Sequence, residues 1–336
     1  MALASMNKKP NILIYGEALI HEFLGQKQIG GAPFNVARTL SLLGDTPLLI
    51  SRLGRDVEAQ LIQAEMLCSG LMSEGIQIDA VHPTGRILAT ESDSGGADYH
   101  RAEGSVQQAD DFIGGAPVSD LLDVYFQETP PDLIYFGSLM ERAPQSKQTL
   151  LSLLESDLTE GTTKFFDLYL IDEQVSAAAI TEALNYADIV KLNERALRFV
   201  IANCCQLASS LDSKLSTDIA GLQIACELLM GQFFMQAVIV TLEGGSYFYF
   251  DADSQTLSNL SNDEVQLATM SAVGATDAAT AADAFSAFFI HGWNQNWRMQ
   301  KTLAAAHEFA TALVDLADAT SERSAFYQTW RGHVAG

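Results

Sequence analysis

The chain contains 336 residues, of which 48% are hydrophobic and 18% charged, so it can bury a large core as one α/β domain or as two smaller ones. Its 42 acidic and 19 basic residues give a net charge of −23, which repels nucleic acid and anionic membranes and excludes both as expected partners. No apolar run reaches the ~18 residues of a membrane-spanning helix. The four cysteines form no Cys-x-x-Cys pair, which favours a reducing, cytoplasmic location.

Apolar runs that read as buried strands alternate with amphipathic helical segments along most of the chain. Strands are predicted where such runs are bounded by Gly, Pro, Asn or Asp, at residues 11–16, 47–54, 132–138, 164–170, 187–193 and 237–245. Between the first two, the segment from Pro33 to Gly44 predicts a helix with proline at its start and glycine at its end. This alternation predicts an α/β fold with a mostly parallel sheet.

Residues 84–104 break the alternation. Their side chains alternate in character, a Gly-Gly pair interrupts them, and they show no helical period. This pattern predicts a β-hairpin that stands off the main sheet and is placed to cover a binding site. Further on, residues 297–318 are rich in alanine and predict a helix.

The sequence lacks the motif residues that zinc-protease sites and phosphate-binding loops require. The "HEFLG" and "HEFAT" segments lack the second histidine of a zinc-protease helix, and the chain has no Gly-x-Gly-x-x-Gly or Gly-Lys-Ser/Thr phosphate loop. The cysteines are expected to act as small buried hydrophobes rather than as nucleophiles.

The segment "GGAPFNVARTLSLLG" is the first candidate binding segment. Gly30 and Gly31 let the backbone approach a ligand closely, and Asn35 follows on the first turn of the predicted helix. Its amide can both donate and accept hydrogen bonds, which suits sugar hydroxyls. The alternative is a Gly-Gly turn followed by an ordinary helix-start asparagine.

The segment "SAVGATDAATAADAFSAFF", residues 271–289, is the second candidate. A loop of small residues leads into a helix with an apolar phenylalanine face, and we expect Asp283 in its first turn. Free N–H groups there would face an incoming anion, and the carboxylate would accept a proton from a hydroxyl nucleophile. Ordinary helix capping by an acid is the alternative.

These two segments, with "YGEALI", "LGRDVEAQL", "ADIVKLN" and "VIVTLEGG" in the same order, resemble the ribokinase-like, or PfkB-type, carbohydrate kinases over roughly residues 11–318. The fructokinase branch is the most similar in pattern. The resemblance implies a doubly wound α/β core as a single domain over 1–336, with a β lid from excursions at about 17–32 and 84–104. It also implies transfer of the γ-phosphoryl group of ATP, bound with Mg²⁺, to a sugar hydroxyl, and a homodimer through the lid.

The resemblance assigns roles to the residues at matching positions. Asp283 is implied as the catalytic base, and the sugar-contacting residues are Glu17, His21, Gly30, Gly31, Asn35, Tyr99 and Arg101. For Tyr99 and Arg101 the alternative is that they are exposed strand residues. The nucleotide and anion-hole residues are Lys191, Asn193, Thr241, Gly244, Gly245, Asp277, Thr280, Ala281 and Ala282. No direct metal ligand is implied, with Glu194 as a candidate.

The chain departs from the family pattern mainly on the phosphate and magnesium side. The family's Gly-Ala-Gly-Asp anion hole reads Thr-Ala-Ala-Asp at 280–283, and Ala196 replaces the glutamate of the Asn-x-x-Glu motif. The Asp-Pro-Asn-x-Arg run reads "DLYLI" at 167–171, and the Thr-x-Gly-x-x-Gly turn reads "TLEGG". On the sugar side, His21 stands where aspartate is expected, but the Gly-Gly-x-x-x-Asn segment is intact.

The sequence therefore predicts an ATP-dependent sugar kinase, most like a fructokinase, with Asp283 as general base. The alternative is a non-catalytic sugar-binding or regulatory pseudokinase on the same fold, because a fold does not by itself guarantee chemistry.

Overall fold

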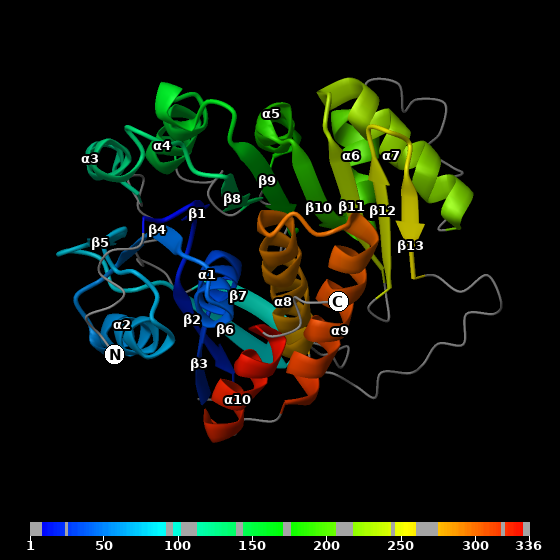
Figure 1. Cartoon of the computed structure of the whole chain (residues 1–336). Helices are drawn as coiled ribbons and strands as arrows, with labels where there is room; N and C mark the ends of the chain where they lie inside the picture. The colour runs from blue at the N-terminus through cyan, green and yellow to red at the C-terminus, as the bar shows by residue number, and fades with distance from the viewer. Residues whose placement is uncertain are drawn as a thin grey trace. The chain divides into compact units, whose positions relative to one another are not determined.

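A computed structural model describes residues 9–23, 26–91, 97–101, 113–138, 144–170, 176–205, 218–242, 246–259, 275–316 and 320–331 (Figure 1). The chain divides into two compact units. The first consists of Met1–Tyr135, Arg142–Thr162 and Ala275–Gly336, and the second of Phe136–Glu141 and Thr163–Gly274.

The first unit holds both candidate binding segments. Its elements in chain order are β1 (Ile12–Tyr15), β2 (Leu19–Phe23), β3 (Gln26–Gly30), α1 (Ala32–Leu43), β4 (Pro47–Leu53), α2 (Val57–Ser69), β5 (Ile76–Ile78), β6 (Arg86–Glu91), β7 (Ala97–Arg101), α3 (Gly115–Tyr125), β8 (Leu133–Gly137), α4 (Pro144–Leu154), the short 3₁₀ helix η3 (Asp157–Thr159), α8 (Ala275–Asn294), α9 (Met299–Asp315) and α10 (Thr320–Arg331). Strand β8 ends in the second unit.

The buried strands of the first unit lie where the sequence predicts them. β1 pairs in parallel with β4, which pairs in parallel with the short edge strand β5. All four residues of β1 are 0% exposed, as expected for a parallel strand that is covered on both faces. Helix α1 also has its predicted ends, because Pro33 lies in its first turn and Gly44, with φ 98°, caps it in the left-handed conformation.

A second, small sheet is separate from the main one. Its strand order is β3-β2-β6-β7, in which β2 pairs antiparallel with β3 and parallel with β6. β6 and β7 pair antiparallel, with Ala89 opposite Tyr99, so the predicted hairpin within 84–104 is present. The two segments predicted to form the lid therefore supply the strands of one sheet.

Two acidic residues, half-buried Asp56 and buried Asp79, fix the chain where it leaves the main sheet for β6. Asp56 caps α2 through the Ala59 N–H at 2.8 Å and also accepts hydrogen bonds from the Thr84 N–H at 2.6 Å and the Thr84 hydroxyl at 2.7 Å. Asp79, 2% exposed, accepts hydrogen bonds from the N–H groups of Val81 and His82 at 2.6 and 2.9 Å. Its carboxylate also lies 2.8 Å from the Arg52 guanidinium. These bonds connect α2 and β4 to the base of the small sheet.

Replacement of Asp79 is expected to lower the free energy of unfolding and to make that free energy less sensitive to acid pH. Burial alone would raise the pKa of Asp79, but the hydrogen bonds from His82 and Val81 and the nearby Arg52 charge lower it from 3.8 to about 2. Because the folded-state pKa is the lower one, this stabilisation is complete above pH 4 and is lost as the pH falls towards 2. Asp79→Asn should lower the free energy of unfolding at pH 7 by about 1.5–3 kcal/mol. Urea unfolding at pH 7 and pH 3 measures this, and an equal loss at both pH values would contradict it.

Helix α8 packs lengthwise against two neighbours, α1 and α9. Figure 1 shows α8 and α9 side by side. The packed face is built from small and aromatic residues, with Ala287, Phe288 and Phe289 each 0% exposed. Small residues on such a face let two helices approach closely, so polar groups at its margins come within bonding distance.

The second unit holds most of the predicted nucleotide-side residues. Its elements are β9 (Thr163–Leu168), α5 (Ala177–Tyr186), β10 (Ile189–Asn193), α6 (Glu194–Cys204), α7 (Ile219–Phe233), β11 (Ala237–Thr241), β12 (Tyr247–Asp251) and β13 (Thr256–Ser258). β9, β10 and β11 are parallel neighbours, and β12 and β13 continue the sheet antiparallel.

Mostly parallel strands flanked by helices, with a small separate sheet, confirm the predicted α/β fold class. Within the described ranges, no helix combines the length and the apolar character needed to cross a membrane.

Candidate functional site

The two candidate segments meet through one hydrogen bond. The side-chain Nδ2 of Asn35, on the first turn of α1, donates to Oδ2 of Asp283, on α8, at 2.8 Å. The two residues are 248 positions apart in sequence, so only the tertiary fold joins them. Both side chains are half-buried, which keeps them accessible to a small ligand. The predicted sugar-contacting amide and the predicted base are therefore direct neighbours.

The backbone approaches closely beside this pair. Gly31 precedes α1 with φ 100°, and a Cβ on it would lie 2.5 Å from the Glu17 carbonyl oxygen. A side chain on Gly30 would overlap the imidazole of His21 on β2. Glu17 is itself buried, at 3% exposure. Five predicted sugar-side residues thus lie around one turn. Both glycines are required there, because a side chain at either position would collide with a neighbouring residue.

His21 is the sugar-side departure from the family pattern, and the structure gives it a distinct character. Burial lowers the pKa of its imidazole below the ordinary value of 6.5. At neutral pH the ring is therefore uncharged, with one nitrogen able to donate and the other to accept a hydrogen bond. An aspartate at this position would instead offer acceptors only.

Gly31→Ala is expected to destabilise the protein by about 2–4 kcal/mol, since it adds a left-handed backbone penalty of about 1–2 kcal/mol to the clash with Glu17. Gly161→Ala is the matched control, because Gly161 has φ 75° but nothing within 4 Å of its added Cβ. Urea denaturation of both variants measures the difference. Equal losses would show that the contact with Glu17 does not matter.

The start of α8 differs from the prediction. The helix begins at Ala275, which makes Asp283 its ninth residue and places it in the third turn instead of the first. The physical reason is composition: alanine is the strongest helix former, and no glycine stands at 280–282 to end the helix there. The free N–H groups of the first helical turn therefore lie about 8–12 Å along the axis from Asp283.

This longer helix changes the predicted anion hole. Thr280, Ala281 and Ala282 lie inside α8, where backbone N–H groups donate to carbonyls four residues earlier. Those N–H groups are not presented to a phosphoryl group, as they would be in a loop. Asp277 is on the first turn of α8, where the helix dipole favours a carboxylate.

On the nucleotide side, Lys191 is buried in an ion pair. Its ammonium lies 2.9 Å from both carboxylate oxygens of Asp167, and the residues are 4% and 7% exposed. They stand directly opposite each other on the parallel strands β10 and β9. Burying two charges requires this kind of pairing. The Lys191 charge is therefore neutralised within the second unit rather than presented to solvent.

Two more of the predicted nucleotide-side residues lie at the carboxyl ends of β10 and β11. Asn193 and Thr241 are opposite each other on β10 and β11. The Asn193 side chain accepts a hydrogen bond from the Ala196 N–H at 2.8 Å and so caps α6. Glu194, the candidate metal residue, accepts hydrogen bonds from Arg198 at 2.9 and 3.1 Å.

These contacts do not fit a protein-built magnesium site. The Glu194 carboxylate is occupied by Arg198, and the Asn193 oxygen is occupied by the helix cap. Across the part of the chain that the structure describes, no group of three or more His, Cys, Asp or Glu side chains is placed to hold a metal ion. Mg²⁺ would have to arrive on the phosphates of ATP, as it does at many nucleotide sites.

Some predicted residues lie outside the description. Gly244 and Gly245 are not described, and for Tyr99, Arg101 and Asp277 only the backbone position is given, on β7 and α8. Their roles stay predictions.

Sequence reasoning missed the partner of Lys191. In the sequence, Asp167 stands out only as part of a degenerate motif. An acid on one predicted buried strand and a lysine on the next could have predicted the ion pair. Three of the four cysteines are buried as expected, whereas Cys68, on α2, is exposed. Burial raises the pKa of Cys205 to about 11 and that of Cys226 to about 12, which leaves both protonated at neutral pH.

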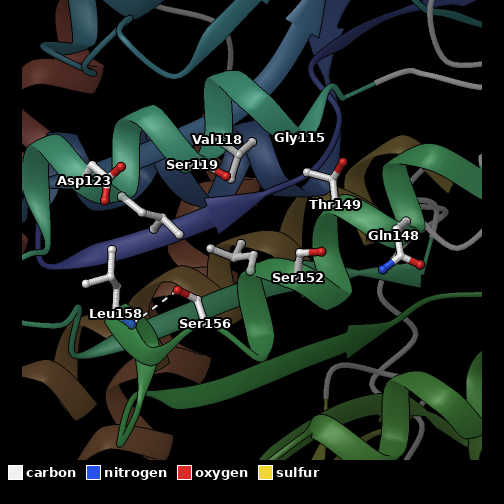
Figure 2. A pocket seen from close by; sticks show the side chains of 11 residues that line it. Gly115, Val118, Ser119, Asp123, Gln148, Thr149, Ser152, Ser156 and Leu158 are labelled. Atoms are coloured by element: carbon white, nitrogen blue, oxygen red, sulfur yellow. Dashed lines mark hydrogen bonds between the residues drawn. The ribbon is translucent and has the colours of Figure 1, made fainter.

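A surface pocket of about 310 Å³ lies elsewhere in the first unit, between α3 and α4. Figure 2 shows Ser119 and Asp123 of α3 and Gln148 and Ser152 of α4 around it. None of its lining residues belongs to the predicted site, so its volume does not bear on the chemistry discussed here.

Comparison with known proteins identifies a family and a fold for the chain. The model of the pfkB family carbohydrate kinases matches residues 5–324. Fructokinase from Vibrio cholerae O395, solved with fructose, ADP and calcium, has a TM-score of 0.68 at 19% identity, covering 98% of this chain and 99% of its own. ATP-bound fructokinase from Xylella fastidiosa has a TM-score of 0.63 at 19% identity, covering 94% and 88%.

An uncharacterised sugar kinase from Pyrococcus horikoshii in complex with ATP has a TM-score of 0.62 at 20% identity, covering 91% of each chain. At these identities the solved structures support the fold alone. A comparison with curated proteins finds no match. The family match, in contrast, spans nearly the whole sequence, and the chain therefore belongs to the pfkB family of carbohydrate kinases.

Proposed function

We propose that the protein phosphorylates a hydroxyl group of a sugar with ATP as the donor, and that Asp283 is the general base. The observation that carries the proposal is the 2.8 Å hydrogen bond from Asn35 to Asp283. It joins a group suited to sugar hydroxyls to a carboxylate suited to taking a proton, beside a turn where glycine lets the backbone pack closely against Glu17 and His21.

In the proposed reaction, the chain's own residues bind the sugar and remove a proton. Asn35 holds the Asp283 carboxylate in a fixed orientation, and Asp283 accepts the hydroxyl proton as the sugar oxygen attacks the γ-phosphorus. The bond from the γ-phosphorus to the bridging oxygen of ADP breaks as the new bond forms, and ADP leaves. The neutral imidazole of His21 adds a group that can donate or accept next to Gly30. Mg²⁺ on the ATP phosphates would supply charge neutralisation.

The test is ADP release from purified protein given Mg·ATP and a panel of ketohexoses, aldohexoses, pentoses and nucleosides. The proposal predicts sugar-dependent ADP release with at least one member, and fructose is the first to try because the fructokinase pattern is the most similar. No turnover with any member, in an assay where a fructokinase control works, would contradict it.

A second candidate function is favoured by the start of α8. Because Thr280–Ala282 lie within the helix, the donors expected to stabilise the transferring phosphoryl group are used inside the helix. A non-catalytic sugar-binding or regulatory protein needs the sugar side only, and that side is the one whose residues lie together. Calorimetry separates the two: sugar binding without Mg·ATP binding supports the non-catalytic protein, and tight Mg·ATP binding excludes it.

A further inference from the structure

A buried pair, His291 and Asp45, joins α8 to the residue that follows the cap of α1. His291 Nδ1 lies 2.6 Å from Asp45 Oδ2, and their side chains are 6% and 3% exposed. Since an ionised carboxylate only accepts hydrogen bonds, Nδ1 must carry the proton. A contact this short and this buried is typical of a strong, charge-assisted hydrogen bond.

Two asparagines, Asn294 at the end of α8 and Asn11 before β1, extend this contact. Asn294 Nδ2 donates to the other Asp45 oxygen at 3.4 Å, and Asn294 Oδ1 accepts a hydrogen bond from Asn11 Nδ2 at 3.2 Å. Asn11 directly precedes β1, and its Oδ1 accepts from the hydroxyl of Thr46, which directly precedes β4. The C-terminal end of α8 is thus connected to the start of two strands of the main sheet.

Packing alone does not account for a histidine here. His291 lies 5.5 Å from the rings of both Phe288 and Trp297, so its surroundings are aromatic. Its Nε2 is buried without a hydrogen-bond partner among the described residues, which costs free energy that a phenylalanine would not lose. What histidine adds at this position is the Nδ1–H bond to Asp45.

The bond of the proposed base joins α8 to α1, and this bond joins α8 to the residue just after the cap of α1. Asp283 and His291 are eight residues apart, two i,i+4 steps, which is about 12 Å along the helix. Asn35 near the start of α1 holds Asp283, and Asp45 just after its end holds His291. Between them Ala284 and Ala287 are buried, at 2% and 0% exposure.

Two polar contacts, one near each end of α1, prevent α8 from sliding along α1. A shift of one residue would move Asp283 by about 1.5 Å along the helix axis, which would lengthen or misalign its 2.8 Å bond to Asn35. Such a shift would also require breaking the bond between His291 and Asp45. The hydrophobic effect is non-directional, so the two hydrogen bonds define this axial position more sharply than apolar burial does.

We propose that Asp45 and His291 are positioning residues that hold α8 in the axial position that places Asp283. The inference rests on the proposed function, because it assigns them an effect on the proton-transfer step. They act through α8 and do not touch the substrate.

The main test is the double variant Asp45→Leu/His291→Phe. Replacing both partners with apolar groups avoids leaving a buried unpaired charge, so the fold is retained while the polar contact is removed. We expect kcat to fall by about 10–100-fold, since a misplacement of about 1 Å costs up to about a hundredfold. KM for the sugar should change by less than about threefold, because Gly30, Gly31 and Asn35 remain.

Two comparison variants separate positioning from stability. Asp45→Asn keeps an oxygen that accepts from His291 Nδ1–H, and it should retain kcat within about threefold of the wild type. Leu150→Ala, in the core of α4, lowers stability without touching α8, and it should leave kcat unchanged. A fall in kcat in the Leu150 variant equal to that in the double variant would overturn the inference.

A second readout does not depend on activity. Hydrogen exchange, followed by mass spectrometry on peptides covering 280–286, should be about tenfold faster in the double variant, with peptides from α4 unchanged. Unchanged exchange at 280–286 overturns the inference whatever the activity. Faster exchange there in a protein that never turns over would support the positioning of α8 and show that the proposed function is what failed.

Discussion

Asp283→Asn is expected to lower kcat for sugar phosphorylation by about 10²–10⁴-fold, the usual contribution of a general base. The sugar Kd should change by less than about threefold, because an asparagine of nearly the same size can still accept the hydrogen bond from Asn35. Steady-state kinetics and calorimetry on the same preparation measure the two effects.

The control for this prediction is Asp132→Asn. Asp132 accepts a hydrogen bond from Asn11 at 2.9 Å, so the substitution removes an exposed carboxylate of the same unit that no part of the proposed site uses. Its kinetics should match the wild type. If Asp283→Asn retains more than about a tenth of wild-type kcat, Asp283 is not the base.

Thr280→Gly/Ala282→Gly is expected to raise ATP turnover by about 10²–10³-fold, the effect of one oxyanion-type donor in other enzymes. Each glycine costs about 1 kcal/mol of helix stability, so the start of α8 should shift from Ala275 towards Asp283. Glycine also enters the left-handed region without a Cβ penalty, so N–H groups now used inside the helix can face a phosphoryl group.

Ala281→Gly is the matched control, because it weakens the same turn of α8 without restoring the Gly-x-Gly spacing of the family. ADP release should rise in the double variant and stay unchanged in Ala281→Gly. A wild type that already turns over rapidly, with no gain in the double variant, would show that the present sequence builds an equivalent site.

The fold could be predicted from the sequence because short apolar runs and turn residues mark where its strands and helices begin and end. Residues 11–16 and 47–54 are short apolar runs with turn residues at their ends, and they became the buried parallel strands β1 and β4. The end of α1 was predictable for a similar reason, since Gly44 takes the left-handed conformation that few other residues adopt.

The site was predicted less completely, because its geometry depends on tertiary contacts. Asn35 and Asp283 were identified separately, but nothing local to either one indicates that they share a hydrogen bond. The pairs Lys191–Asp167 and His291–Asp45 are likewise formed by residues from different elements. The position of Asp283 was misjudged because a loop was expected where an alanine-rich segment continues the helix.

Ala196 shows how burial limits a repair designed from sequence. The family has glutamate at this position, so Ala196→Glu would restore the motif. Ala196 is 0% exposed at the start of α6, however, and a carboxylate there would be buried without a cationic partner built for it. Ala196→Glu would therefore destabilise the start of α6 while it restores the motif.

Transfer of label from ATP to sugar shows whether the protein is a sugar kinase with Asp283 as its base. The wild type and Asp283→Asn would be incubated with γ-³²P-labelled ATP, Mg²⁺ and the sugar that gives the highest ADP release, and the products separated. We expect the wild type to form labelled sugar phosphate in amounts equal to the ADP formed. We expect the variant to form it at least about 10²-fold more slowly. Label found only in inorganic phosphate, or equal labelling of the sugar by both proteins, would contradict it.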